Sequence, residues 1–219
     1  MISQATFNFI KDVTANNDRE WFAENKIRYD QARENMIDFT AAMLAELAKT
    51  DAGVKEVDPK KAVQRIYRDI RFSKNKTPYK NHFGVSFASK ASKPDTTGYY
   101  LHIMPLGSFV GGGIWQPQSE NIKAIRQEID YNGAAFKEIV DSKKWIDTFG
   151  EFRNGNSLKT TPKGYDTDHE DIALLKLKDF IGMHNISTTA LTKKESYKTV
   201  ANVLEQIYPL NEFLNNAIA

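Results

Sequence analysis

Residues 98–114, GYYLHIMPLGSFVGGGI, contain two runs of apolar and aromatic residues separated by Pro105 and Gly107. Such runs are typical of β-strands, and proline and glycine between them are typical of tight connections. A similar run, FGVSF, precedes them at residues 83–87. Three short runs with turn residues between them predict an antiparallel meander at the centre of the fold.

The segment before this meander fits two structures. Residues 62–72 are rich in β-branched and aromatic side chains, which favours a further strand and extends the expected sheet to about residues 62–115. Asp58 and Pro59 form a helix start signal, however, and the apolar residues that follow also fit a helical period. We favour the strand.

Helical patterns precede the sheet. Asp18 is a good N-cap for a helix that we expect to run to about Lys49, with apolar residues recurring at spacings of three and four. A shorter helix is expected at about residues 4–15.

Helical patterns also follow the sheet. Ser119 is expected to cap a helix, and residues 172–181 are expected to combine a helical turn with a strand. A last helix starts near Lys194 and is broken or kinked at Pro209. The whole pattern predicts one α+β domain over residues 1–219, with a central, mainly antiparallel sheet packed by the N- and C-terminal helices.

Composition excludes several classes of protein and site. The chain has no cysteine, which rules out disulfides, thiolate metal sites and cysteine nucleophiles. Its first residues lack the features of a signal peptide, and no stretch approaches the ~18 apolar residues of a membrane span. We therefore expect a cytoplasmic protein without a membrane partner, and no cofactor is evident.

Positive charge is concentrated just before the meander. Residues 60–82 hold eight of the 30 Lys and Arg residues and one of the 28 acids, Asp69, which gives a net charge of +7. The remaining 22 basic and 27 acidic residues give −5. A cationic segment in an otherwise acidic chain can gather anions, so this segment predicts an anion-binding site.

The candidate anion-binding side chains are Arg65, Arg68, Arg71, Lys74, Lys76 and Lys80. Alternation along a strand prevents all six from converging, and we expect Arg65, Arg71 and Lys80 to do so first. Asp69 is expected to support Arg71 or Arg68, and not to act as a general base, because flanking cations favour its ionised form. Alternatively, these cations pair with surface acids elsewhere in the fold.

Aromatic residues and histidines near this segment could complete a pocket. We expect Tyr79, Tyr100 and Trp115 in its walls, with His82 or His102 as the proton-transfer group if the protein is an enzyme. The two histidines lie on consecutive expected strands and could meet across a hairpin. Alternatively, the aromatic residues are half-buried members of the sheet.

Two other motifs carry weaker signals. Residues 111–113, GGG, could offer backbone N–H groups to an anion, or form a strand that another backbone approaches closely; we favour the second interpretation. No metal site is predicted, because the histidines lack the short spacings of known metal motifs, and Asp168 more simply caps a helical turn.

The leading functional hypothesis is an anion-binding site for a phosphorylated or carboxylated small molecule. One rival is a nucleic-acid-binding module, because basic and aromatic residues are interleaved, although the acidic remainder of the chain argues against a broad phosphate-tracking surface. The other rival is a non-catalytic domain that docks an acidic protein partner.

Five separated strings, in this order, resemble one widespread bacterial family, the conserved domain of unknown function 2461. They are NNDREWF (16–22), RIYRDIRFSKNKTPYKNHFG (65–84), GYYLHI (98–103), GGGIWQP (111–117), and PKGYDTDH (162–169) followed by LLKLKDF (174–180). Asn75 departs from the family pattern, which usually has Asp, and so removes a possible acid from that loop. The resemblance implies a cytosolic, single-domain bacterial protein of mixed α/β content, and it supplies no activity, substrate or catalytic residue.

Overall fold

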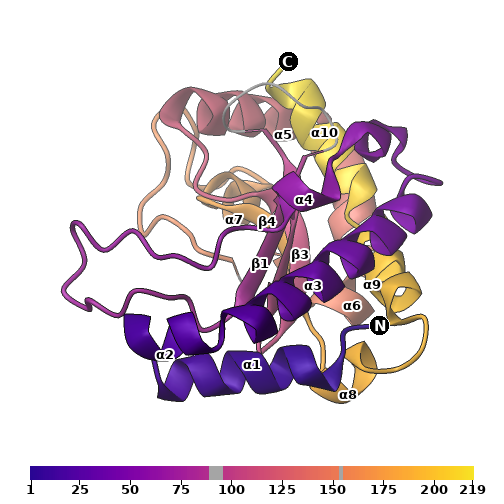
Figure 1. The fold of residues 1–219 in the computed structure, drawn as a ribbon. Helices are drawn as coiled ribbons and strands as arrows, with labels where there is room; N and C mark the ends of the chain where they lie inside the picture. Colours follow the sequence, from indigo (N-terminus) through magenta and orange to yellow (C-terminus); the bar gives the residue numbers. More distant parts are fainter. Residues whose placement is uncertain (89–95, 153–154) are drawn as a thin grey trace.

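The centre of the molecule is a four-stranded antiparallel sheet in the order β1-β2-β3-β4. The computed structural model describes residues 1–88, 96–152 and 155–219. The strands are β1 (Phe83–Phe87), β2 (Gly98–Ile103), β3 (Phe109–Ile114) and β4 (Phe180–Asn185). β1 to β3 form the expected meander, and β4 joins the edge of β3 after a long, mainly helical excursion (Figure 1). The predicted α+β domain with a central antiparallel sheet is confirmed.

Helices lie before, within and after the strand sequence. Before it are α1 (Gln4–Ala15), α2 (Arg19–Glu24), α3 (Lys26–Leu47), the 3-10 helix η1 (Ala52–Glu56) and α4 (Pro59–Ala62). Between β3 and β4 are α5 (Ser119–Val140), α6 (Lys143–Phe149) and α7 (Ile172–Leu175). After β4 are α8 (Thr188–Leu191), α9 (Ser196–Glu205) and α10 (Tyr208–Ala217).

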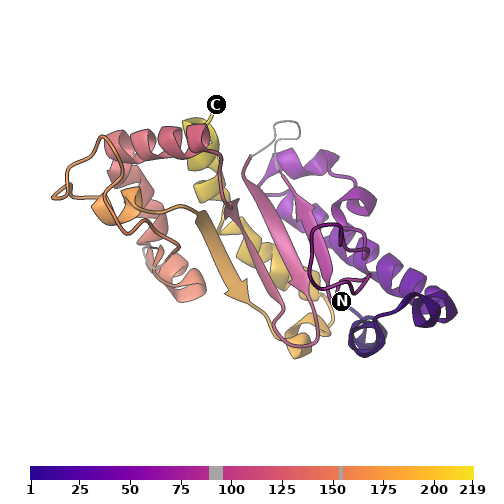
Figure 2. The same ribbon diagram turned by 90° about the vertical axis from the view of Figure 1, so that its left-hand side faces the viewer.

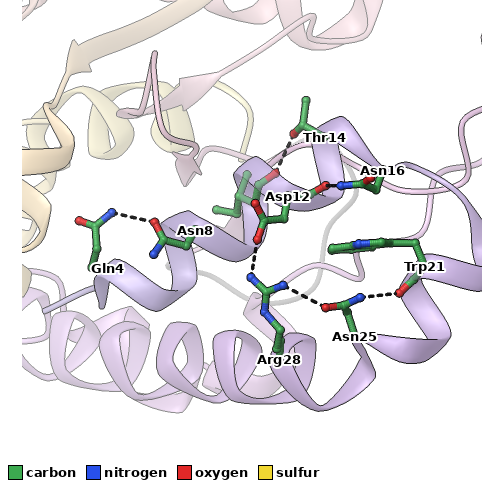
Figure 3. A network of polar contacts seen from close by, with 9 residues as sticks. Gln4, Asn8, Asp12, Thr14, Asn16, Trp21, Asn25 and Arg28 are labelled. Atoms are coloured by element: carbon green, nitrogen blue, oxygen red, sulfur yellow. Dashed lines mark hydrogen bonds and ion pairs between the residues drawn. The ribbon is translucent and has the colours of Figure 1, made fainter.

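The expected helix from Asp18 is divided at Asn25 into α2 and α3. The Asn25 side-chain amide donates to the carbonyl oxygen of Trp21 at 2.9 Å, and its oxygen accepts from Arg28 at 2.9 Å. Arg28 also forms an ion pair with Asp12 of α1 (Figure 3). One polar network therefore links α2 to α3 and connects both to α1.

The prediction of a strand at residues 62–72 is wrong. Asp58 caps the single turn of α4, and the chain then becomes an irregular loop whose ladder contacts are isolated bridges, such as that between Tyr67 and Tyr79. Val63 and Ile66 are buried, but they are three residues apart, so burial along this segment does not alternate as in a strand.

One smaller expectation also needs correction: Ser119 is the first residue of α5, and the N-cap of α5 is Gln118. The helix expected from about Lys194 is broken near Pro209: α9 ends at Glu205, and Pro209 lies in the first turn of α10, where the missing N–H of proline costs no hydrogen bond. The helical turn and strand expected around residues 172–181 are present as α7 and β4.

One face of the sheet is covered by helices. Leu101 and Ile103 of β2 are buried in a first hydrophobic cluster with residues of α1, α3 and α9. Ile114 of β3 and Phe180 of β4 are buried in a second cluster with residues of α5, α6, α7 and α10. Figure 2 looks onto the other face, with α9 and α10 behind the strands. Within the described ranges, no helix has both the length and the apolar character required to cross a membrane.

Candidate functional site

A groove of about 880 Å³ lies on the uncovered face of the sheet. The glycines of β3 form its floor, and its walls include Tyr100 and His102 of β2, Trp115 after β3, and Ile181 and Met183 of β4. The structure therefore brings Tyr100, His102 and Trp115, three of the residues predicted from the sequence, to one groove.

Strand register explains how these side chains meet. Ser86 of β1, Tyr100 of β2, Gly111 of β3 and Met183 of β4 are direct neighbours across the sheet. Directly opposed residues point to the same face, so this row faces the groove. The residues on either side of Tyr100 in β2 point the other way and are buried in the first hydrophobic cluster.

Gly113 shows why β3 is rich in glycine. Its φ is +116°, and a Cβ placed there would lie 2.0 Å from the carbonyl oxygen of Phe180 in β4. β3 pairs with β2 on one side and with β4 on the other, so its backbone N–H groups serve the sheet. The glycines allow two backbones to approach closely, as favoured from the sequence, and they leave the groove floor without side chains.

Five polar side chains lie together over β1 and β2; we call Gln64, Lys80, His82, Tyr100 and His102 the polar cluster. Lys80 Nζ donates to Gln64 Oε1 at 2.8 Å. The Tyr100 hydroxyl lies 3.2 Å from His102 Nδ1, and the rings of His82 and His102 stack with centroids 4.0 Å apart. The two histidines thus meet across the β1–β2 pair, as their positions in the sequence suggested.

Burial controls the protonation of the polar cluster. It is the main cause that lowers the pKa of His82 to about 4, with smaller contributions from His102 and Lys80. Burial and Lys80 also lower the pKa of His102, and burial raises the pKa of Tyr100. Near pH 7 both imidazoles are therefore neutral, and each can accept or donate a hydrogen bond.

Lys80 is the cation of this cluster. Burial, followed by repulsion from Arg65, lowers the pKa of Lys80. Its hydrogen bond goes to a neutral amide, and within the described parts of the chain it forms no ion pair with a carboxylate. Lys80 is not among the residues that line the groove, but its hydrogen bond to the groove-lining Gln64 places a positive charge, without a carboxylate partner in the described residues, beside the polar end of the groove.

The other predicted cations do not converge on the groove. Arg68 and Lys76 each donate to a carbonyl oxygen of their own loop at 2.9 Å. Arg65 and Lys74 are exposed. Because residues 63–78 form a loop and not a strand, the expected alternation does not set where these side chains point.

Asp69 and Tyr79 have structural positions. The Asp69 carboxylate pairs with Arg71 at 2.7 Å, and this hydrogen bond lowers the pKa of Asp69. The expected contact between Asp69 and Arg71 is present, and because the pair is exposed it contributes little to stability. Tyr79 does not line the groove: it is buried and stacks on Phe22 with ring centroids 4.0 Å apart.

The remaining histidines make structural contacts. His169 Nδ1 accepts from the backbone N–H of Asp171 at 3.0 Å, so its proton lies on Nε2, which donates to Asp130 at 2.9 Å. His184 Nδ1 lies 2.9 Å from the carbonyl oxygen of Thr148.

Sequence reasoning missed several groove residues. Ile181 and Met183 carried a usable signal, because they are two positions apart in β4 and therefore share a face. Gln64 carried none, because its position depends on the return of the chain from residue 64 to Lys80, which no local pattern specifies.

Comparison with known proteins gives the family of the chain. No curated protein and no solved structure matches it. A family model described as "Conserved hypothetical protein (DUF2461)" matches residues 5–213, nearly the whole chain. The resemblance noted from the five sequence strings is thereby confirmed, and the chain belongs to the DUF2461 family.

Proposed function

We propose that the groove binds a small organic anion, with its carboxylate or phosphate at the polar cluster and its apolar body over the glycine floor. The observation that carries this proposal is Lys80, a partly buried cation whose described hydrogen-bond partner is neutral. A bound anion would supply the missing negative charge through a charge-assisted hydrogen bond.

The other end of the groove supports an apolar or aromatic ligand body. Trp115 is 69% exposed and Met183 is 50% exposed, so both offer apolar surface to a ligand. Small-molecule sites are usually of about 300–1,000 Å³, largely apolar, with a few polar groups that fix orientation. The groove has both parts, and its volume of about 880 Å³ falls in that range.

The neutral histidines add orientation to this site. His102 could accept a hydrogen bond from a hydroxyl group of the ligand, and the Tyr100 hydroxyl could donate to its anionic group. His102, one of the two histidines named as proton-transfer candidates, is suited to that role, because a neutral imidazole can accept a proton from a ligand.

Thermal-shift and calorimetric titration with benzoate, phenyl phosphate and nucleoside monophosphates tests the proposal, with benzyl alcohol as the uncharged comparison. A ligand at one hundred times its Kd stabilises the fold by about 2.7 kcal/mol. Lys80→Met should weaken binding of the responding anion by roughly 10- to 150-fold, as expected for loss of a charged hydrogen bond.

Lys74→Met is the matched control, because Lys74 is an exposed lysine of the preceding loop. It should leave the Kd unchanged. The proposal is wrong if none of these anions stabilises the protein, or if Lys74→Met and Lys80→Met weaken binding equally.

A further inference from the structure

The loop of residues 65–77, which we call the basic loop, is stabilised by hydrogen bonds between its own residues. Arg68 Nη1 donates to the carbonyl oxygen of Thr77 at 2.9 Å, and the Asn75 side-chain oxygen accepts from the Thr77 N–H at 2.9 Å. Lys76 Nζ closes the tip by donating to the carbonyl oxygen of Ile70 at 2.9 Å. The loop projects away from the sheet on the left of Figure 1.

This ordered loop exposes an aromatic ring among cations. Phe72 is 95% exposed, and the Arg71 guanidinium lies 5.9 Å from its ring centroid. Tyr67, at the base of the loop, is 48% exposed. Arg65 and Lys74 are exposed, and among the described residues neither forms an ion pair.

The basic loop combines exposed cations with the exposed aromatic ring of Phe72, and a binding partner should use both. An acidic protein surface would neutralise the cations, but its carboxylates would offer no planar group to stack on the Phe72 ring. A nucleic acid single strand uses both, because its phosphates pair with cations while its bases stack on aromatic rings. We propose that the basic loop binds a short single-stranded nucleic acid, with a base on Phe72 and phosphates on Arg65, on Lys74 and on Nη1 of Arg71, whose Nε and Nη2 bind Asp69.

The surroundings limit the size of this contact. A hollow beside the loop is lined by Lys76 together with Asp18, Arg19 and Glu20 of the α2 region, so two carboxylates lie on that side beside one further cation. The chain outside residues 60–82 carries a net charge of −5. The protein should therefore contact about three phosphates of the bound oligonucleotide. This number predicts a slope of about −2 for the logarithm of the binding constant against the logarithm of the salt concentration.

Fluorescence anisotropy with fluorescein-labelled oligo-dT and oligo-rU of twelve nucleotides measures this binding. From 50 to 200 mM NaCl, the Kd should rise roughly 20-fold. Phe72→Ala should weaken binding by roughly 5- to 150-fold through loss of base stacking. Because Phe72 is almost fully exposed, the circular dichroism spectrum of this variant should be unchanged.

Charge variants separate the loop from the rest of the surface. Lys74→Gln should reduce the magnitude of the salt slope by about 0.7. Lys123→Gln, the same change at an exposed position of α5, should leave the slope unchanged. Lys80→Met should also leave oligonucleotide binding intact, so this proposal and the small-anion proposal can fail separately.

Three results would overturn the inference. The first is no binding of either oligonucleotide at 50 mM NaCl. The second is equal binding by Phe72→Ala and the unchanged protein. The third is displacement of the oligonucleotide by poly-glutamate of equal charge at the same concentration as by unlabelled oligo-dT, which would identify a surface for acidic proteins.

Discussion

His82 shows how a single side chain couples this site to stability. Its ring is partly buried against His102 and near Lys80, and its pKa is lowered to about 4, compared with 6.5 for a free histidine. Between these two values, the unfolded chain binds a proton that the folded chain excludes. Stability should therefore fall as the pH decreases from about 6.5 towards 4, and this contribution should not change further below pH 4.

His82→Gln removes the titrating group and keeps a polar side chain of similar length. The difference in unfolding free energy between the unchanged protein and this variant, from urea titrations at several pH values, should decrease through that window. A difference that stays constant from pH 7 to pH 4 would show that His82 titrates alike in both states.

Part of the polar cluster could be predicted from the sequence, because its basic, aromatic and histidine residues lie in or near the basic segment. Lys80, His82, Tyr100 and His102 were named as candidates, and the structure places all four in the polar cluster. Their mutual arrangement was predictable only where two strands pair directly. The position of Lys80 depends on a loop that has few backbone hydrogen bonds. One of them runs from the Lys80 N–H to the carbonyl oxygen of Ile66.

At the scale of elements, β3 depends on its glycines. Gly113→Ala would place a methyl group 2.0 Å from a carbonyl oxygen of β4 at a φ of +116°. Gly164 has a similar φ of +96° but no atom within 4 Å of an added Cβ. Gly164→Ala should therefore cost only backbone strain, about 1–3 kcal/mol.

Gly113→Ala should cost more than this control, because β3 and β4 must also move apart. The unfolding free energies of both variants, from denaturant titration, test the comparison. Equal losses would mean that the close approach of the two strands adds nothing to the cost of the positive φ.

Residues 62–72, predicted as a strand, form a short helical turn followed by a loop, and this difference shows which elements a local sequence pattern can specify. The strands β1, β2 and β3 were predictable because each is a short run bounded by turn residues and contains apolar or aromatic side chains. Val63, Ile66 and Tyr79 are also apolar and buried, but they anchor a loop to the core at separate points. Apolar content alone cannot distinguish such anchors from a strand, since both bury β-branched and aromatic side chains.

At the scale of the whole molecule, two hydrophobic clusters share one sheet. β3 contributes Val110 to the first cluster and Ile114 to the second, and Phe149 of α6 packs against both. Because one strand takes part in both, neither cluster can lose its packing without disturbing the other. We therefore expect the chain to unfold in a single transition.

The tryptophans allow a direct test. Trp21 packs against the first cluster, and Trp145 is buried in the second. In a variant with Trp115 and Trp145 changed to Phe, the fluorescence comes from Trp21 and reports on the first cluster. In a variant with Trp21 and Trp115 changed to Phe, it comes from Trp145 and reports on the second cluster. In each variant, the fluorescence and circular dichroism midpoints in urea should coincide. Separate midpoints would reveal two independently folding units.

The alternation along β2 has a consequence for how proteins of this kind can diversify. Positions 99, 101 and 103 maintain the core, whereas Tyr100 and His102 face the groove, so the two roles are interleaved along one strand yet physically separate. If the groove binds a ligand as proposed, a substitution at position 100 or 102 would change the groove wall without removing a residue of the first hydrophobic cluster. Binding preference could then change by single-residue steps while that cluster is retained.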